Sequence, residues 1–330
     1  MECLYHDSIP EHRALRENRM RVCVTGATGQ IGGALIKRLL AEGSDIQVLA
    51  RASTRADELE TQRVQVIRGD LSDETAIESA INGAEVVYHI AAKVSGAGGL
   101  DVYVETNCKG TQRVFEASVR QHVRRVIYLS SIAVYGLARP GDSIDEDTPL
   151  DSAPEQRDLY SRTKIAADEI AISYSDRLPV TIIRPGIVYG PGRPLPLGLL
   201  AVCLGQWNLV FANKRQRFPL NYLENLVDAI LLAGKEGGEE LRQYIVVDDA
   251  DLTLERYHKE KSEADGTRTI FLPGWPVLLG GSLGGIPRHH AKRALQDRKY
   301  DTRRIREGLG WKPRIALAEA IRQSLQPPCV

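Results

Sequence analysis

The chain has 330 residues, and its 43 Lys and Arg side chains balance its 43 Asp and Glu side chains, so its formal net charge is zero. This balance lacks the excess of one sign that is typical of proteins whose main partner is nucleic acid or an anionic membrane, and we expect neither as a partner. The five cysteines are scattered without metal-ligand spacing, which predicts no metal site and favours a reducing, cytoplasmic location.

Hydrophobic patterns divide the chain into three predicted parts. Residues 1–19 are polar and lack the apolar segment of a secretory signal peptide, so we expect a tail. In residues 20–184, short β-rich runs alternate with helical patterns. This is typical of a Rossmann-type α/β fold, a doubly wound parallel sheet covered by helices on both faces. In residues 185–330 the alternation is lost, and we expect a smaller substrate-binding lobe that completes a cleft.

The predicted elements follow in chain order. They are strand 21–25, helix 30–42, strands 46–50 and 64–68, helix 74–81, strand 85–90, helix 104–121, strand 125–130, helix 156–174 and strand 180–184. The Pro- and Gly-rich stretch 185–196 excludes a long regular element. Beyond it we expect a helix at 222–233, a strand at 243–247, a polar stretch at 251–268 and a helical C-terminal region.

The first predicted strand runs directly into the sequence TGATGQIG, residues 25–32, in which glycines stand three residues apart. Glycine allows the tight turn, the close approach of the backbone to a pyrophosphate, and close packing of helix on strand. The N-terminus of the following helix offers N–H groups and a partial positive charge to phosphates. This context predicts a dinucleotide site formed by Gly26, Thr28, Gly29, Gln30, Ile31 and Gly32.

The end of the second predicted strand indicates which dinucleotide binds. NAD-specific sites place Asp or Glu there to bind the ribose hydroxyls, but this strand ends in Ala50 and Arg51. A guanidinium matches the oxygens of a 2′-phosphate, and Arg55 lies in the loop that follows. We therefore predict NADP(H) rather than NAD(H), with Arg51 as the phosphate ligand. The alternative is that Arg51 is a solvated loop charge.

Several short motifs follow the glycine run in a fixed order. They are Gly69-Asp70-Leu71, His89-Ile90-Ala91-Ala92, Asn107 within NxxGT, Ser130-Ser131 before VYG, the YxxxK pair Tyr160 and Lys164, and Arg184-Pro185-Gly186-Ile187. Together with the glycine run they resemble the extended short-chain dehydrogenase/reductase superfamily, of the NAD-dependent epimerase/dehydratase type. The resemblance covers nearly the whole chain from residue 20 onward.

The resemblance implies a role for each motif. Asp70, followed by Leu71, is implied to read the adenine amino group, and the backbone of Ala91, Ala92 and Lys93 to lie along the cofactor. Further cofactor contacts are implied for Asn107, Ser130, Tyr160, Lys164, Pro185 and Ile187. The implied catalytic residues are Ser131, Tyr160 and Lys164. Dimers are common in the family, so a homodimer stays open.

The chemistry of the YxxxK pair agrees with this. Tyr160 and Lys164 are four residues apart on a predicted helix, so their side chains share one face. An unperturbed tyrosine has a pKa near ~10, too high for a base at neutral pH, and a nearby ammonium favours the phenolate. Ser131 can bond the substrate oxygen while Tyr160 transfers its proton and a nicotinamide exchanges hydride.

Two positions indicate the branch. Dehydratases carry acidic residues after the catalytic hydroxyl, where this chain has Ile132 and Ala133, and sugar-nucleotide epimerases carry an Asn where this chain has Ile187. The segment 222–229 and the sequence Gly310-Trp311-Lys312-Pro313 resemble the 3β-hydroxysteroid dehydrogenase-like branch. We therefore predict an enzyme, an NADP(H)-dependent oxidoreductase that interconverts a ketone and a secondary alcohol on a bulky or apolar molecule. The alternatives are a nucleotide-sugar epimerase or reductase, and a non-catalytic NADP(H)-binding regulator.

Other conspicuous residues have simpler interpretations. We expect His89 to pack or bond locally, Cys108 to be a small core residue, and His289 and His290 to form a solvated turn. Aromatic side chains that could line an apolar pocket or belong to the core are Trp207, Phe211 and Trp275. Three basic side chains leave an acidic or phosphorylated substrate as an alternative, namely Lys214, Arg215 and Arg217.

Overall fold

The computed structural model describes residues 19–52, 59–61, 63–136, 143–192, 195, 201–238, 240–275 and 295–326. The predictions for the tail at residues 1–18, for Arg55, and for His289 and His290 lie outside the described residues. No helix in these described ranges is long and apolar enough to cross a membrane.

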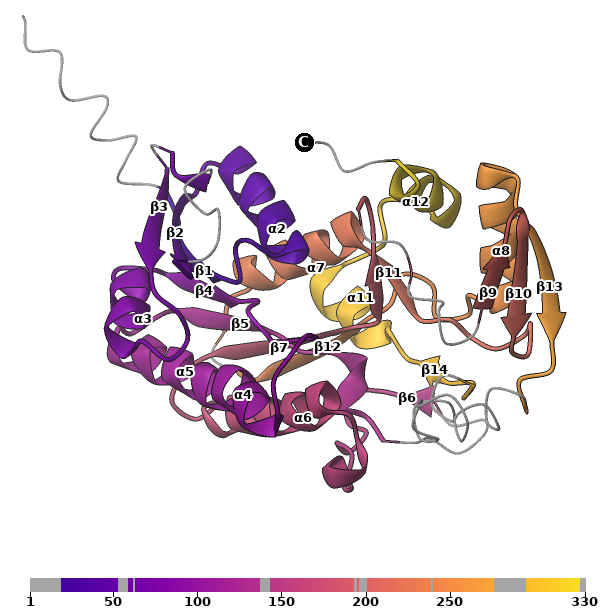
Figure 1. Ribbon diagram of the computed structural model, residues 1–330. Helices are drawn as coiled ribbons and strands as arrows, with labels where there is room; N and C mark the ends of the chain where they lie inside the picture. The colour runs from indigo at the N-terminus through magenta and orange to yellow at the C-terminus, as the bar shows by residue number, and fades with distance from the viewer. Residues whose placement is uncertain are drawn as a thin grey trace, which may run out of the picture.

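A seven-stranded parallel sheet forms the centre of the described structure (Figure 1). Its order is β12-β7-β5-β4-β1-β2-β3. The bounds are β1 Arg21–Thr25, β2 Asp45–Ala50, β3 Val64–Arg68, β4 Val86–His89, β5 Arg125–Leu129, β7 Val180–Pro185 and β12 Arg242–Val246. The order reverses between β1 and β4, and ligands of doubly wound sheets bind in the crevice at such a reversal. The predicted Rossmann-type fold is confirmed.

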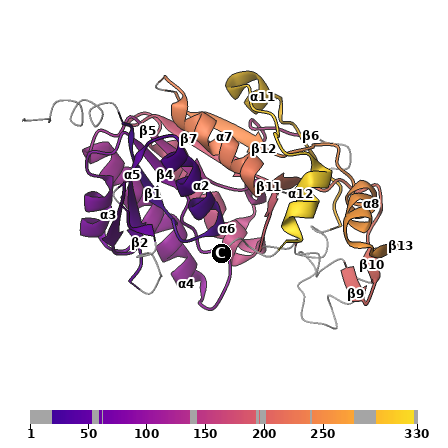
Figure 2. The same ribbon diagram turned by 90° about the horizontal axis from the view of Figure 1, so that it is seen from above.

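Helices cover both faces of this sheet (Figure 2). On one face lie α2 (Gln30–Ala41) and α7 (Leu223–Lys235), and on the other lie α3 (Glu74–Ile81), α5 (Gly110–Arg120) and α6 (Leu159–Ser173). Successive strand residues serve the two layers in turn, since side chains alternate along a strand: Val22 and Val24 pack with α2, whereas Cys23 packs in the other layer. A sheet buried on both sides explains why its strands are apolar throughout.

The predicted helix at 104–121 is longer and less regular in the structure. It begins earlier as α4 (Leu100–Tyr103), passes through a π-helical turn (Val104–Lys109), and continues as α5. π-turns are frequent at functional sites, and this one contains Asn107. The helix predicted to begin at residue 156 begins at Leu159, because the side chain of Asp158 caps it by accepting from the Ser161 N–H.

Smaller sheets lie beside the large one and are built mostly from the chain after β7. β8 (Ile187–Tyr189) pairs with β11 (Leu220–Tyr222), β6 (Ser143–Ile144) pairs with β14 (Lys299–Tyr300), and β9 (Ala201–Leu204), β10 (Trp207–Phe211) and β13 (Arg268–Leu272) form a three-stranded sheet. The polar stretch at 251–268 folds mostly into α8 (Leu254–Asp265), and the C-terminal region supplies α11 (Arg303–Leu309) and α12 (Leu317–Ser324).

Part of the C-terminal half returns to the large sheet. β12 pairs with β7, and α7 packs on the same face as α2. The side-chain amide of Asn225 in α7 donates to the Ile315 carbonyl and accepts from the Ile315 N–H, both at 2.9 Å. The backbone carbonyl of Asn225 accepts from the buried Trp311 indole at 3.0 Å. The division of the chain at residue 185 stays a prediction, because residues beyond it contribute to both parts.

Candidate active site

The glycine run forms a tight turn between β1 and α2. Gly26 has φ 76°, and a Cβ on it would lie 2.7 Å from the Ala91 nitrogen. A Cβ on Gly32 would lie 2.2 Å from the Gly26 carbonyl oxygen, so glycine is required there by close packing. α2 starts after Gly29 with no side-chain cap and no acidic residue in its first turn. Its first N–H groups are thus left for an anion, as a pyrophosphate requires.

A cleft of about 640 Å³ opens at the carboxyl ends of β1, β2, β3 and β4. Twelve of the predicted cofactor residues line it, namely Gly26, Thr28, Gly29, Gln30, Ile31, Gly32, Arg51, Asp70, Leu71, Ala91, Ala92 and Lys93. The glycine turn, the uncapped helix and this cleft fit a nicotinamide dinucleotide. The predicted residues that are not part of its lining are Asn107, Ser130, Tyr160, Lys164, Pro185 and Ile187.

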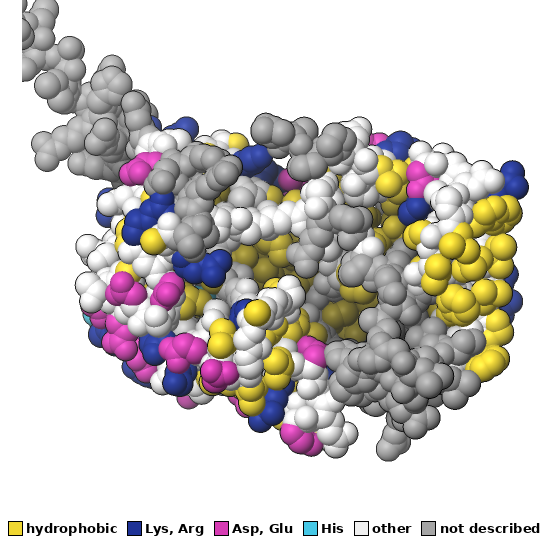
Figure 3. Space-filling view, viewed as in Figure 1, with side chains coloured by type: hydrophobic (Ala, Val, Ile, Leu, Met, Phe, Trp, Pro, Cys, Tyr) yellow, Lys and Arg dark blue, Asp and Glu magenta, His cyan; other side chains and the backbone are white. Residues whose placement is uncertain are grey.

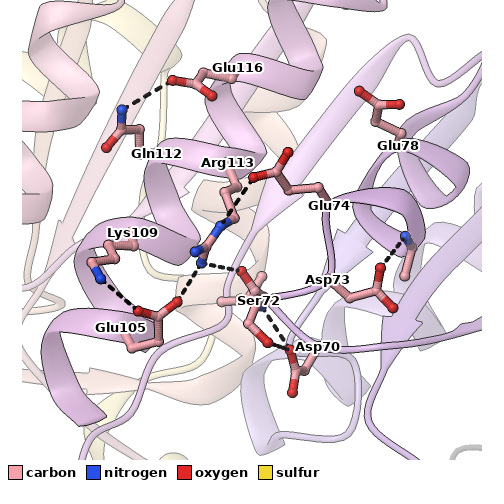
Figure 4. A network of polar contacts seen from close by, with 12 residues as sticks. Asp70, Ser72, Asp73, Glu74, Glu78, Glu105, Lys109, Gln112, Arg113 and Glu116 are labelled. Carbon is pink, nitrogen blue, oxygen red and sulfur yellow. Dashed lines mark hydrogen bonds and ion pairs between the residues drawn. The ribbon is translucent and has the colours of Figure 1, made fainter. Parts of the chain in front are cut away.

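Asp70 and Arg51 lie together at the end of the cleft formed by β2 and β3. The Asp70 carboxylate accepts both the N–H and the hydroxyl of Ser72, and these bonds, together with the nearby charge of Arg51, hold the pKa of Asp70 below its usual value. The loop is braced by Arg113 of α5, which donates to the Leu71 carbonyl at 3.0 Å and to Glu105 at 2.7 Å (Figure 4). Asp70 therefore stays ionised and held at the rim of the cleft.

His89 is the centre of a buried hydrogen-bond chain. Its Nδ1 lies 2.7 Å from the Thr25 hydroxyl, and its Nε2 lies 3.0 Å from the Thr111 hydroxyl. Thr111 donates its own proton to the Asn107 carbonyl at 2.6 Å, so it accepts from Nε2–H, and Nδ1 in turn accepts from Thr25. Burial lowers the pKa of His89 to about 3, so the ring is neutral, and the prediction of local bonding is confirmed.

Asn107 holds the cleft wall rather than lining it. In the π-turn its Oδ1 accepts from the Lys93 N–H at 2.7 Å, and its Nδ2 donates to the Lys93 carbonyl at 3.0 Å. The same Nδ2 donates to the Thr163 hydroxyl of α6 at 3.0 Å. Asn107 thereby ties the backbone at Lys93, which lines the cleft, to the helix that carries Tyr160 and Lys164. Cys108 beside it is buried, as predicted.

Lys164 is 1% exposed and held by two acceptors of β5. Its Nζ donates to the Tyr128 hydroxyl at 2.6 Å and to the Leu129 carbonyl at 2.8 Å, and lies 4.2 Å from the centre of the Tyr128 ring. Burial lowers the pKa of Lys164 to about 8, opposed by the charge of Asp168. An ammonium has three donors, so these bonds use two of them.

Tyr160 and Ser131 stand at the ends of their elements. Tyr160 is partly exposed in the first turn of α6, on the same face as Lys164. Ser131 is also partly exposed, and its Oγ accepts from the Ala133 N–H at 3.1 Å. With respect to the described residues, its own O–H is left to donate to a bound molecule.

A buried ion pair that sequence reasoning missed supports this corner. Asp168 is fully buried, accepts from the Ser130 hydroxyl, and pairs with Nε of Arg184 at 2.8 Å. Arg184 also donates to Tyr135 at 2.9 Å and to Gln243 at 2.6 Å, which joins α6 to β7 and β12. The signal was the spacing: Asp168 follows Lys164 by four residues and thus shares its helix face. The hydroxyl of Ser130 is taken by this pair.

The segment after β7 is held from the second half of the chain. The Gly186 N–H donates to Asn221 at 2.7 Å, and a Cβ on Gly186 would lie 2.5 Å from the Pro219 carbonyl oxygen. Asn221 in turn donates to the partly exposed Asp248 at 3.1 Å. Ile187 begins β8, which pairs with β11. Its side chain packs against the hydrophobic cluster that includes Val210 of β10 and Leu220 of β11. These contacts position the backbone at Gly186, between Pro185 and Ile187.

Several other predicted pocket residues have different surroundings. Trp207 and Trp275 are 36% and 61% exposed, so neither is a core residue. Arg217 pairs with Asp297 at 2.8 Å, and Lys214 pairs with Glu255 at 2.8 Å. The cleft has lining residues that the sequence did not predict, including Val102, Glu105 and Thr106. Their only signal was their position within the five residues that precede Asn107. Among the described residues, no group of three or more His, Cys, Asp or Glu side chains could hold a metal ion.

The model of the NAD dependent epimerase/dehydratase family matches residues 22–249 of the chain. The chain belongs to this family. It is thus an NAD(P)-dependent enzyme of the extended short-chain dehydrogenase/reductase type, as the motifs predicted.

Within this family the chain is similar to enzymes of different chemistry. It is 29% identical to the UDP-glucose 4-epimerase of Mycolicibacterium smegmatis, over 93% of this chain and 98% of the relative. It is 25% identical to a 3 beta-hydroxysteroid dehydrogenase/isomerase of Mycobacterium tuberculosis, over 92% and 89%. The solved structure of MoeE5 with UDP-glucose and NAD has a TM-score of 0.70 and 23% identity, over 92% of this chain and 97% of that one, which shows the shared fold.

Proposed function

We propose that this protein is an NADP(H)-dependent oxidoreductase that interconverts a ketone and a secondary alcohol on a bulky or apolar small molecule. The observation that carries the proposal is the environment of Lys164. Its amine is buried one helical turn from Tyr160, held by Tyr128 and Leu129, and tied through Thr163 and Asn107 to the wall of the dinucleotide cleft.

In this mechanism a bound nicotinamide supplies or accepts the hydride. During reduction, Tyr160 donates its phenolic proton to the carbonyl oxygen while the new C–H bond forms at the carbonyl carbon; during oxidation, the phenolate removes the hydroxyl proton. Ser131 donates a hydrogen bond to the same oxygen. The remaining donor of Lys164 is left for the nicotinamide ribose, and its positive charge favours the phenolate of Tyr160.

Three observations support an apolar substrate. Ile132 and Ala133, which follow Ser131, provide no carboxylate for a dehydration. Ile187 provides no amide for a sugar-nucleotide phosphate. Arg217, one of the basic side chains that would suit a phosphorylated substrate, is already paired with Asp297. The steroid dehydrogenase relative acts on a substrate of the proposed class.

The test of the catalytic assignment is Tyr160→Phe, which keeps the ring and removes the transferable proton. A panel of apolar ketones and secondary alcohols is screened first by nicotinamide absorbance, and the best substrate is used for both proteins. We expect turnover to fall on the order of 10²–10⁴, typical of a lost general acid/base, with NADPH affinity nearly unchanged. Normal turnover by the variant would remove Tyr160 from the mechanism.

The preference for NADP(H) rests on Ala50 and Arg51. Ala50 is buried and offers the ribose no carboxylate, while Arg51 lines the cleft. A charge-assisted bond to a 2′-phosphate contributes roughly 1.5–3 kcal/mol, which corresponds to a preference of about tenfold to a hundredfold. Arg51→Ala should abolish most of it by weakening NADPH far more than NADH, as measured by dissociation constants. Equal affinity of the wild type for both cofactors would contradict this assignment.

The similarity to UDP-glucose 4-epimerase favours a second candidate, a nucleotide-sugar epimerase. Calorimetry of the NADP-loaded protein with UDP-glucose separates the two candidates. We expect weak or no binding, because Ile187 cannot bond a phosphate. Low-micromolar binding would instead support the epimerase.

A further inference from the structure

The three-stranded sheet of β9, β10 and β13 has an unusual outer face. Its inner face packs on α8, where Thr269 lies 3.1 Å from His258 and the Phe271 ring meets the His258 ring edge-on. Strand registers place the alternate residues on the outer face, namely Val202, Leu204, Trp207, Leu209, Phe211, Arg268, Ile270 and Leu272. A sheet with one buried face normally carries polar residues on the other, but apart from Arg268 this outer face is apolar.

The exposure of the outer face is concentrated rather than scattered. Of the eight large hydrophobic residues that are exposed in the described ranges, Val202, Leu204, Trp207 and Ile270 belong to this face, and Trp275 follows β13 directly. Leu204 is 57% exposed and Trp275 is 61% exposed. Figure 3 shows hydrophobic side chains gathered over these strands. Contiguous apolar patches of this kind mark contact with a protein, a ligand or a membrane.

The charges and aromatic residues of this region favour a membrane. Arg268, at the edge of the outer face, lies with its guanidinium carbon 5.4 Å from the centre of the Trp207 ring, so an apolar surface is bordered by a cation. Two of the three tryptophans of the chain, Trp207 and Trp275, are exposed here. Tryptophan is enriched at membrane–water interfaces, and basic residues bind anionic headgroups.

We propose that the outer face of β9, β10 and β13 docks on the surface of an anionic lipid membrane. Trp207, Leu204 and Ile270 enter the headgroup region of one leaflet, and Arg268 contacts lipid phosphate. The proposal differs from the expectation, drawn from net charge, that a membrane is not a partner, because a balanced total says nothing about how charge and apolar area are distributed. The proposal does not depend on the substrate or on the cofactor preference.

The test is flotation of the full-length protein with vesicles of phosphatidylcholine alone and of an equimolar mixture with phosphatidylglycerol. We expect the wild type to float with the anionic vesicles. The double variant Leu204→Thr/Ile270→Thr removes two half-exposed apolar side chains and should lower partitioning about tenfold or more. Arg268→Gln should weaken binding to anionic vesicles only. Leu325→Thr, at a residue of similar exposure at the end of α12, is the matched control and should bind like the wild type.

Tryptophan fluorescence with brominated lipids shows which face is bound. Trp207 and Trp275 should be quenched, whereas Trp311, which is 1% exposed, should not be and serves as the internal reference. Circular dichroism establishes that each variant is folded. The proposal is overturned if the wild type does not float with either vesicle, or if the double variant binds normally. It is equally overturned if the wild type does not bind vesicles but forms a dimer that the double variant disrupts. In that case the face contacts a second copy of the chain and not a membrane.

Discussion

The hydroxyl of Tyr128 is the most informative atom to remove from the site. Tyr128→Phe keeps the buried ring, and with it the contact between the ring and the Lys164 amine, but deletes the acceptor that lies 2.6 Å from Nζ. The carbonyl of Leu129, at 2.8 Å, remains. The substitution therefore isolates one hydrogen bond to a single buried amine.

The size of the effect follows from the type of bond. A hydrogen bond to a charged group stabilises by roughly 1.5–3 kcal/mol, and one pKa unit corresponds to about 1.4 kcal/mol. Because the bond favours the ammonium, its loss should lower the pKa of Lys164 by about one to two units from the present value of about 8. At pH 7 the ammonium fraction should then fall from about nine tenths to one half or less.

Two measurements check this, and one of them does not depend on turnover. NMR titration of protein labelled at the lysine side chains should follow the pKa of Lys164 directly. In the proposed reaction, the alkaline limb of kcat/KM should move to lower pH by the same amount. Tyr88→Phe is the matched control, because Tyr88 is a buried strand tyrosine of β4 whose hydroxyl has no hydrogen-bond partner within the described structure. It should leave both profiles unchanged.

An unshifted Lys164 titration in a folded Tyr128→Phe protein would refute the reasoning. It would mean that the Tyr128 hydroxyl does not stabilise the ammonium, and that the Leu129 carbonyl and the charge of Asp168 are sufficient. A change in stability alone, with both pH profiles unmoved, would assign Tyr128 to packing and not to the positioning of Lys164.

Two further predictions concern the buried polar groups. His89 takes up a proton near pH 6.5 when unfolded but only at about 3 when folded, so its contribution to stability is present above pH 6.5 and is lost as pH falls, by up to about 1.4 kcal/mol per unit. Urea unfolding of His89→Asn should lack this slope; equal slopes in both proteins would contradict it. Asp168→Asn leaves Arg184 buried without its counter-charge and should destabilise by about 3–5 kcal/mol, whereas Glu255→Gln, which breaks the exposed pair with Lys214, should cost less than about 1 kcal/mol. Similar losses in the two variants would refute that assignment.

Local sequence determined the elements of the large sheet. β1, β3 and β7 lie within one residue of their predicted bounds, because apolar β-rich runs ended by glycine or charge leave little choice of structure. The glycine turn was equally local, since Gly26 has φ 76° and Gly32 packs on the Gly26 carbonyl oxygen within one strand–turn–helix unit. Helical spacing alone placed Tyr160 and Lys164 on one helix face, whereas the expectation of an active site on this helix also rested on the resemblance to the family.

Tertiary structure decided what surrounds these residues. No local pattern indicates that Lys164 bonds Tyr128, 36 residues earlier, or that Asn107 joins Lys93 to Thr163. The π-turn that aims Asn107 depends on these distant contacts, and helical periodicity does not record it. The apolar outer face of β9, β10 and β13 also emerged only from strand register, because an alternating strand has the same pattern whichever face is covered. Sequence determines which side chains share a face, but only the packing of distant segments determines what that face meets.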